Sequence, residues 1–321
     1  MKPQIRILLL LTVSLACAIG FAPAAAAQQP DEVVKVNTDL VVLDAQVINK
    51  KTGQPVGKLR REDFELFEDG VRQEISYFGQ DELPLSILLL LDVSGSVRPI
   101  IEQVGEGALS ALEQLKPQDE VAVMAFANRA VLIQSFTKER RLVSDKIREA
   151  SRMDSIGRGT LLNDALFEAA KEMPGASNPA SRRVVIVVTD NIAEHEGKNA
   201  TRRTMTELLE SGSVVYGLIV RAGVGTVINV MTLGRFSHAL NPYSEETGGE
   251  MIGAGKGEVA SKLAEMISHL RTRYSLGYKP SNTNEDGTFR RLKLQLAAAA
   301  SQQRKLVVKT KKGYYFRKAK M

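Results

Sequence analysis

The chain has 321 residues, enough for two domains or for one large domain with additions. Hydrophobic residues make up 44% and charged residues 25% of the sequence, and these globular proportions exclude a disordered or collagen-like chain. A net charge of +6 is too small to indicate a nucleic-acid partner, and the three histidines leave little material for zinc chemistry or histidine-based catalysis.

The first 27 residues have the features of a secretory signal peptide. Lys2 and Arg6 precede an apolar run that ends near Phe21, and small residues follow up to Ala27. A charged start, a short apolar run and an Ala-x-Ala end are typical of a cleaved leader. We therefore expect residues 1–27 to be removed and the protein to be secreted or periplasmic. Contact with a membrane is expected only if this leader stays uncleaved.

Residues 28–83 carry the pattern of β-strands. The β-branched, roughly alternating runs are residues 33–38, 40–47, 64–68 and 71–78. Between the last two runs lies Asp69-Gly70, and Asp-Gly between alternating runs is a strong hairpin signal. We expect an all-β segment that is too short to enclose a core alone.

From residue 84 the pattern changes to strands that alternate with amphipathic helices. Leu85–Leu91 is a continuous apolar run, typical of a strand buried on both faces of a parallel sheet. Further strands are expected at 121–127, 130–136, 184–188, 214–220 and 250–252, and helices at 99–115, 139–150, 161–172, 201–211 and 257–272. This alternation predicts a doubly wound, mostly parallel α/β domain over residues 84–276. The connection at 221–248 fits poorly, and it is either functional or contains a short helix.

The pattern returns to strands at the C-terminal end, with runs at 274–278, 289–297 and 305–311. Residues 28–83 and 277–321 would each leave an apolar face uncovered if they folded separately. We therefore expect these two segments to pair into one β-sandwich, with the α/β domain inserted between them.

A carboxylate and two hydroxyls end the first strand of the α/β segment, in Asp92-Val93-Ser94-Gly95-Ser96. Open α/β sheets bind ligands at the carboxyl ends of their strands, and hard divalent cations prefer oxygen ligands. Two later positions fit the same pattern, because Thr160 opens an expected helix and Asp190 follows another expected strand. The candidate metal ligands are Asp92, Ser94, Ser96, Thr160 and Asp190.

In these residues and their order, the sequence resembles the von Willebrand factor type A domain over about residues 84–276. The metal-ion-dependent adhesion site of that family takes the form Asp-x-Ser-x-Ser, a distant Thr and a distant Asp. The resemblance implies that Mg²⁺ is bound by the three hydroxyls, and by the two carboxylates directly or through waters, with Mn²⁺ or Ca²⁺ as alternatives. It also implies an open coordination position, which a Glu or Asp carboxylate of a protein partner fills. Asn191 departs from the family, in which many members have Gly after this Asp.

The flanking segments carry a second resemblance, through residues 59–70, 274–278 and 312–315. They look like a bacterial subgroup of secreted proteins that contain this domain. Because the function of that subgroup is poorly defined, this resemblance supports the architecture more than an activity.

Simpler roles remain open for the candidate ligands. Ser94 and Ser96 could cap the helix that follows them, Thr160 could be the N-cap of its own helix, and Asp190 could be a turn residue. We expect a non-enzymatic, metal-dependent module for protein binding or adhesion. The alternatives are a structural component of an envelope assembly with a vestigial metal site and, less favoured because no further carboxylate is positioned as a base, a metal-assisted hydrolase.

Overall fold

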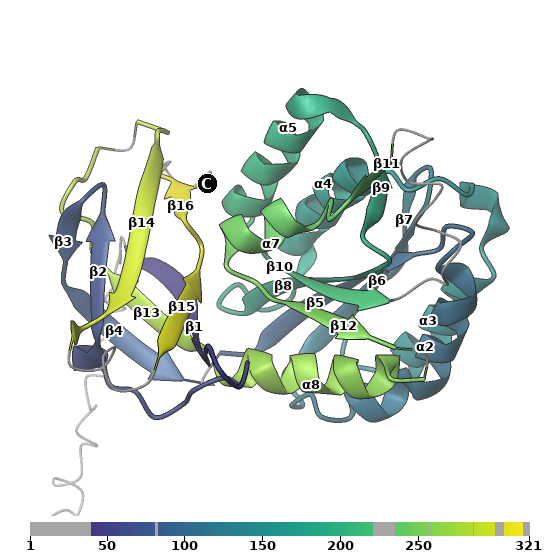
Figure 1. The fold of residues 1–321 in the computed structure, drawn as a ribbon, viewed down its shortest axis with the longest axis horizontal. Coiled ribbons are helices and arrows are strands. Elements are labelled where there is room, and N and C mark those ends of the chain that lie inside the picture. Colours follow the sequence, from purple (N-terminus) through teal and green to yellow (C-terminus); the bar gives the residue numbers. More distant parts are fainter. Residues whose placement is uncertain are drawn as a thin grey trace, which may run out of the picture. The chain divides into compact units, whose positions relative to one another are not determined.

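The computed structural model of the chain contains a six-stranded, mostly parallel sheet, two four-stranded antiparallel sheets and a two-stranded antiparallel pair (Figure 1). The structure describes residues 40–80, 83–220, 235–255, 257–284, 286–298 and 305–316. The expected leader at 1–27, the expected strand at 33–38 and residues 221–234 lie outside this part. No helix in the described part is long and apolar enough to cross a membrane.

The central sheet has the strand order β12-β10-β8-β5-β6-β7. Its strands are β5 (Leu85–Asp92), β6 (Glu120–Phe126), β7 (Ala130–Thr137), β8 (Arg182–Thr189), β10 (Val214–Val220) and β12 (Met251–Ala254). Every neighbouring pair is parallel except β6 and β7, which are antiparallel. All residues of β5 and β6 are buried. The expected mostly parallel α/β sheet is therefore confirmed.

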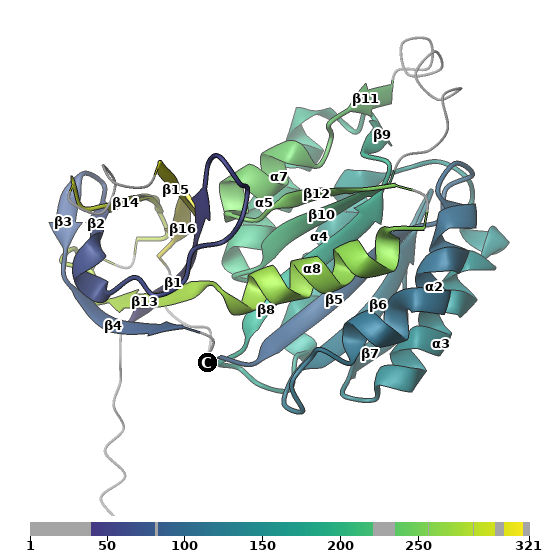
Figure 2. The ribbon, with the colours of Figure 1, turned by 60° about the horizontal axis from the view of Figure 1, so that its bottom comes forward.

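Helices cover both faces of this sheet (Figure 2). One face carries α2 (Arg98–Leu112), α3 (Arg140–Ser151) and α8 (Val259–Arg271), and the other carries α4 (Leu162–Glu172), α5 (Gly197–Glu210) and α7 (Asn241–Thr247). Because side chains alternate along a strand, neighbours on β5 enter different cores. Leu89 packs in the core with Ile101 and Leu263, whereas Leu88 packs in the core with Leu166 and Leu208.

Several short elements connect these layers. Strands β9 (Ile192–Glu194) and β11 (Arg235–Ser237) form a small antiparallel pair after β8. Short 3-10 helices span Arg61–Asp63, Asp154–Ile156 and Met173–Gly175. Helix α7 lies within the connection 221–248, for which the sequence left a short helix as one of two interpretations.

The two remaining sheets, called the flanking sheets below, draw their strands from both ends of the chain. One has the order β15-β1-β13-β4 and the other β16-β14-β2-β3. Their strands are β1 (Val41–Asn49), β2 (Phe64–Glu68), β3 (Val71–Gln73), β4 (Ile75–Gln80), β13 (Tyr274–Tyr278), β14 (Phe289–Leu296), β15 (Leu306–Thr310) and β16 (Gly313–Tyr315). All neighbouring pairs are antiparallel, and side chains such as Leu43, Leu66, Leu276 and Leu294 share one core. This shared core is the packing that the expected sandwich requires.

Strand β13 follows helix α8 after only two residues and pairs with β1 and β4. It therefore crosses the domain boundary that the sequence analysis placed after residue 276. Buried polar contacts also join the flanking sheets to the α/β part. Asp44 Oδ1 lies 3.1 Å from Arg182 Nε, and Gln46 Nε2 donates a hydrogen bond of 3.3 Å to Glu250 Oε2.

Candidate metal site

The candidate site lies where the two central strands β5 and β8 end. These strands are parallel neighbours in the register Leu91 to Val188, so their carboxyl ends meet at one edge of the sheet. After β5 the chain adds β6 and β7 on one side of this strand, and it then adds β8, β10 and β12 on the other side. The order of the strands therefore reverses at β5. Ligands of open α/β sheets bind at such a point. Asp92 is the last residue of β5, and Asp190 directly follows β8.

Hydrogen bonds connect the side chains from these two strand ends. Ser96 Oγ donates to Asp190 Oδ2 over 2.8 Å, and the hydroxyl oxygens of Ser94 and Ser96 are 3.4 Å apart. The backbone N–H of Ser94 donates to Asp92 Oδ1 over 2.9 Å, and Thr189 Oγ1 donates to Asp92 Oδ2 over 2.7 Å. Four of the five candidate ligands are thus brought together. Thr189 is a further member that sequence reasoning missed.

The Asp92 carboxyl is fully buried, and its surroundings disfavour a negative charge. Burial is the largest influence on this group, and together with the negative charge of Asp190 it raises the pKa of Asp92 to about 7, although hydrogen bonds from Thr189 and Ser94 act in the opposite direction. A divalent cation beside the two carboxylates would remove this penalty, because its charge favours their ionised forms.

Thr160 is held at the same edge of the sheet by its backbone. Its carbonyl oxygen accepts a hydrogen bond of 3.0 Å from the N–H of Glu194 in β9, and the next residue, Leu161, donates from its N–H to the oxygen of Ala127 just after β6. The Thr160 residue is only 2% exposed. No hydrogen bond within the described residues joins its hydroxyl to the other four candidate side chains, so its role as a fifth ligand stays a prediction.

Helix capping does not occupy the candidate hydroxyls. Helix α2 has Val97 as its N-cap and α4 has Leu161, and neither N-cap side chain makes a capping hydrogen bond. The free N–H groups of Asn163 and Asp164 at the start of α4 are instead satisfied by the two carboxylate oxygens of Glu196, over 2.7 and 3.0 Å. Because Glu196 lies 33 residues further along the chain than Asn163, no local pattern indicated this cap.

Asp190 does serve as a turn residue, in addition to its contact with Ser96. Its Oδ1 accepts a hydrogen bond of 3.1 Å from the N–H of Ile192, whereas Oδ2 accepts from Ser96. One carboxylate oxygen of Asp190 therefore stabilises the turn, and the other contacts the hydroxyl of Ser96 at the candidate site.

Asn191 stands where many von Willebrand factor type A domains have Gly, and its conformation and side-chain contacts account for this difference. Its φ of +62° lies in the left-handed region, which Gly and Asn tolerate best. Its Oδ1 accepts a hydrogen bond of 2.8 Å from the N–H of Leu240, and its Nδ2 donates to Asn241 Oδ1 over 2.9 Å. Asn191 therefore keeps the turn and also anchors the start of α7, a function that Gly could not provide.

The donor set fits a hard divalent cation. All candidate donors are oxygens, two from carboxylates and three from hydroxyls, and this is the ligand type that Mg²⁺ selects. Groups of three or more His, Cys, Asp or Glu side chains that could hold a metal are absent from the described part of the chain. A site built here thus depends on the hydroxyls as much as on the carboxylates, which distinguishes it from a zinc or thiolate site.

Comparison with known proteins finds a similarity over the central strands. Residues 87–193 match the family described as von Willebrand factor type A domain, and this range contains all five candidate ligands. No curated protein matches the chain in sequence.

Solved structures of low sequence identity are similar to part of the chain. BatB from Bacteroides thetaiotaomicron, a conserved hypothetical protein, is 16% identical with a TM-score of 0.44 over 58% of this chain and 98% of that chain. A von Willebrand factor type A protein from Catenulispora acidiphila is 11% identical with a TM-score of 0.47 over 76% and 72%. Proximal thread matrix protein 1 from the mussel byssus, with a zinc-occupied MIDAS motif, is 13% identical with a TM-score of 0.42 over 58% and 48%. The family match thus covers residues 87–193, and over this range the chain is similar to the von Willebrand factor type A domain.

Proposed function

We propose that this chain is an exported, non-enzymatic binding protein that captures an acidic group of a protein partner through a divalent metal ion. Mg²⁺ would be held by Asp92, Ser94, Ser96, Thr160 and Asp190, with Mn²⁺ or Ca²⁺ as alternatives. Export rests on the signal-peptide pattern of residues 1–27.

The observation that carries this proposal is the contact between segments that are distant in sequence. Ser96 and Asp190 are separated by 94 residues, and their side chains are hydrogen-bonded over 2.8 Å beside the buried Asp92 carboxyl. Two negatively charged carboxylates near each other at a buried edge of a sheet carry a cost in free energy unless a positive charge compensates them. A divalent ion supplies that charge and, since the hydroxyls are neutral, retains an affinity for one more anion.

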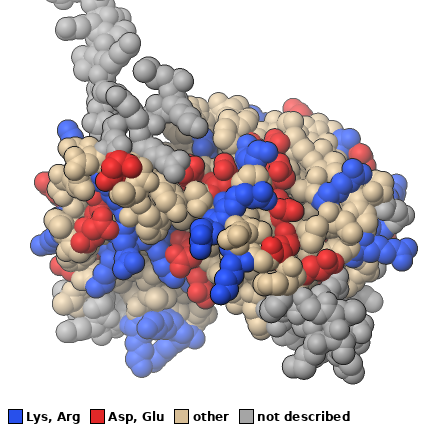
Figure 3. All heavy atoms as spheres, turned by 90° about the horizontal axis from the view of Figure 1, so that it is seen from above, with Lys and Arg blue, Asp and Glu red and all other residues tan. Residues whose placement is uncertain are grey.

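An acidic protein partner follows from the same charges. A metal ion that is bound by two carboxylates and by neutral oxygens attracts a further carboxylate and does not attract a positively charged group. On the face shown in Figure 3, Lys and Arg side chains are intermixed with Asp and Glu side chains, so no patch of one sign covers it. Because nucleic-acid binding uses a concentrated basic surface, we propose no nucleic-acid partner.

The absence of enzymatic activity is part of this proposal. The two carboxylates that lie at the candidate site already have assigned roles, Asp92 as a buried acceptor and Asp190 as an acceptor for Ser96 and for the turn. A hydrolase would need an additional positioned base beside the metal.

Thermal unfolding with and without Mg²⁺ tests the metal site. At a Mg²⁺ concentration 100 times its Kd, a ligand that binds only the folded state adds about 2.7 kcal/mol. For a chain of this size that corresponds to a rise of roughly 5 °C in Tm. Asp92→Asn keeps the size of the buried side chain and should abolish the rise. Asp145→Asn, at an exposed acid on α3 that is paired with Arg148, is the matched control and should keep it.

Binding of the partner is tested by co-purification from the cell envelope in Mg²⁺, followed by elution with EDTA. The expected eluate contains a protein that the Asp92→Asn variant does not retain. If wild-type protein shows no Mg²⁺-dependent change in Tm, or if Asp92→Asn responds like wild type, the metal site is refuted. Retention of the partner in EDTA would favour a structural role in an envelope assembly.

A further inference from the structure

Two loops carry the three candidate hydroxyls at the carboxyl edge of the central sheet. The first loop, residues 93–97, connects β5 to α2 and holds Ser94 and Ser96, and the second loop, residues 152–161, connects α3 to α4 and holds Thr160. Within the described residues, no hydrogen bond joins the Thr160 hydroxyl to a candidate side chain of the first loop. The separation between the hydroxyls of the two loops is therefore set by other contacts.

Arg98, the first residue of α2, bonds to both loops through its guanidinium. Its Nε and Nη2 donate to the backbone oxygen of Val93 in the first loop, over 3.1 and 2.9 Å. Its Nη2 also donates to the backbone oxygens of Met153 and Gly157 in the second loop, over 3.2 and 3.4 Å. Because a guanidinium is planar and its N–H groups have fixed directions, these bonds hold the carbonyl groups of the two loops at a set separation.

The carbonyl groups that Arg98 binds lie close in sequence to the candidate ligands. Val93 lies between Asp92 and Ser94, and Gly157 precedes Thr160 by three residues. Because few backbone bonds separate each carbonyl from a candidate ligand, a movement of one loop against the other would change the separation of their hydroxyls.

Both loops are also held to the end of β6. In the first loop, the N–H of Val93 donates to the oxygen of Phe126 over 2.9 Å. In the second loop, the oxygen of Ile156 accepts from the N–H of Asn128 over 3.0 Å, and Asn128 Oδ1 accepts from the N–H of Gly159. Each loop thus has its own anchor on β6, and the guanidinium of Arg98 adds a direct link from one loop to the other.

The charge of Arg98 gives two explanations of its role opposite signs. The guanidinium stays positively charged, and its bond to Val93 places that charge close to the backbone beside Asp92. Like charges repel, so electrostatics alone predicts that removing the charge of Arg98 tightens the binding of a divalent cation. If Arg98 acts by holding the two loops, its removal weakens that binding.

We propose that Arg98 is a positioning residue of the metal site, which sets the separation between Thr160 and the hydroxyls of the first loop. This inference rests on the proposed function, since it names a residue that determines how tightly the same site holds its ion. Arg98 is not itself a ligand, because its side chain has only donors, and it acts on the ion through the two loops.

Isothermal titration of the protein with MgCl₂ tests this role in two variants of Arg98. Arg98→Gln removes the charge and the planar fork, and it should raise the Kd for Mg²⁺ about tenfold, as expected for a group that orients metal ligands. Arg98→Lys keeps the charge but not the fork and should raise the Kd about threefold. The Tm of each variant without Mg²⁺ shows that it is folded.

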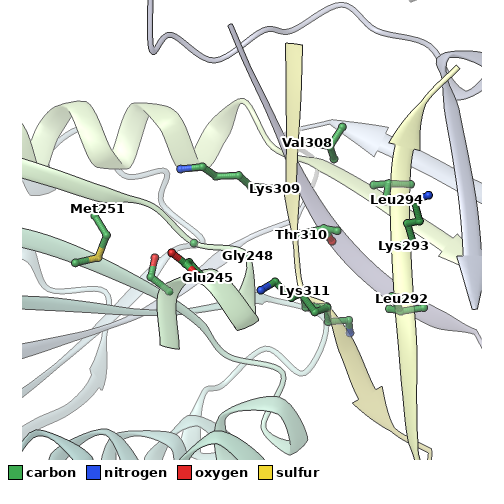
Figure 4. Close-up of a pocket in the computed structure, with 13 residues that line it drawn as sticks. Glu245, Gly248, Met251, Leu292, Lys293, Leu294, Val308, Lys309, Thr310 and Lys311 are labelled. Carbon is green, nitrogen blue, oxygen red and sulfur yellow. The ribbon is translucent and has the colours of Figure 1, made fainter. Parts of the chain in front are cut away.

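Two other cationic residues provide controls. Arg140 on α3 also binds backbone oxygens, those of Lys116 and Asp119 over 2.9 and 2.8 Å, but these residues precede β6 and lie at the opposite end of the central sheet. Lys309 lies on β15, beside the cleft between β14, β15 and the end of α7 (Figure 4). Arg140→Gln controls for the loss of such bonds and Lys309→Gln for the loss of a positive charge, and both should leave the Kd within about twofold of wild type.

A double-mutant cycle with Thr160→Val tests whether Arg98 acts through Thr160. Val keeps the branched shape of Thr and lacks its hydroxyl. If Arg98 positions that hydroxyl, Arg98→Gln should raise the Kd less than about twofold in the Thr160→Val background, against about tenfold in the wild-type background. Effects that add in full would overturn the proposal.

Hydrogen exchange of the metal-free protein tests the second loop without Mg²⁺. The N–H of Leu161, next to Thr160, donates to the oxygen of Ala127 over 2.9 Å. It should exchange about tenfold faster in Arg98→Gln and at the wild-type rate in Arg140→Gln. Unchanged exchange in Arg98→Gln, or Mg²⁺ binding by this variant as tight as that of wild type, overturns the role of Arg98 alone. A wild-type protein that does not bind Mg²⁺ overturns the proposed function instead.

Discussion

Replacing Asp44 by Ala would leave the guanidinium of Arg182 buried without its carboxylate partner. Arg182 Nε lies 3.1 Å from Asp44 Oδ1, and the two side chains are 1% and 15% exposed. This pair connects β1 of a flanking sheet to the start of β8 in the central sheet. Removing one member of a buried ion pair costs about 3–5 kcal/mol, because the remaining charge stays desolvated.

The expected cost for Asp44→Ala is close to the lower limit of that range, about 3 kcal/mol. Arg182 keeps hydrogen bonds to the backbone oxygen of Leu270 and to Ser275 Oγ, over 2.6 and 3.0 Å, and the partial exposure of Asp44 admits some solvent. Urea unfolding measures the loss, and Glu168→Ala is the control, since Glu168 forms an exposed pair with Lys171 that is worth less than about 1 kcal/mol. A loss for Asp44→Ala no larger than that of the control would refute this reasoning.

The pH dependence of the same pair has a defined sign. Burial by itself raises the pKa of Asp44, but the charges of Arg182 and Arg273 and a hydrogen bond from Ser275 outweigh it and hold the pKa below its ordinary 3.8. A depressed carboxyl pKa contributes stability that is present above 3.8 and is lost as the pH falls through the folded-state value. Asp44→Asn should therefore lose less stability than wild type when the pH is lowered below about 4.

Three further changes test local features by urea unfolding. Gly248→Ala should cost more than about 2 kcal/mol, because its φ is +80° and the new Cβ would lie 2.3 Å from Thr310, whereas Gly212→Ala, with φ +69° and open space around it, should cost only about 1 kcal/mol. Glu196→Ala should cost about 1 kcal/mol, since the first turn of α4 loses both of its capping acceptors. Asn191→Ala should cost about 2 kcal/mol of stability. Ala tolerates the left-handed φ of this position less well than Asn does, and the N–H of Leu240 would lose its acceptor.

The central sheet was predictable because its signals are local. A run such as Leu85–Leu91 has no polar face, and only a strand with helices on both sides can bury it. The pairing of the N-terminal and C-terminal strands could be inferred because each segment alone would leave an apolar face exposed to solvent. The sequence predicts the end of the α/β part after residue 276, which lies inside β13, because the composition of a strand does not show which sheet it joins. The contacts of β13 with β1 and β4 are made by residues about 200 positions apart.

The candidate site shows the same division between local and distant information. Asp92 and Asp190 follow apolar strands, and the carboxyl ends of parallel neighbours meet at one edge, so their proximity could be inferred from sequence. The contact between Thr189 and Asp92 spans 97 residues and uses a side chain at the last position of β8. No periodic pattern distinguishes such a hydroxyl from one that only fills space.

The two serines of the site differ in a way that separates structural from metal-binding roles. Ser96 Oγ donates to Asp190 without any metal, so Ser96→Ala should lower the stability of the metal-free protein by about 1 kcal/mol. Ser94 holds Asp92 through its backbone N–H, which Ser94→Ala keeps, and its hydroxyl makes only a long contact of 3.4 Å with that of Ser96. Ser94→Ala should therefore lower metal-free stability less than Ser96→Ala does. If both hydroxyls bind the ion, both variants should nevertheless lose most of the Mg²⁺-dependent rise in Tm. A full rise in Ser94→Ala would mean that this hydroxyl does not bind the metal, and the set of ligands would then have to be smaller than the resemblance implies.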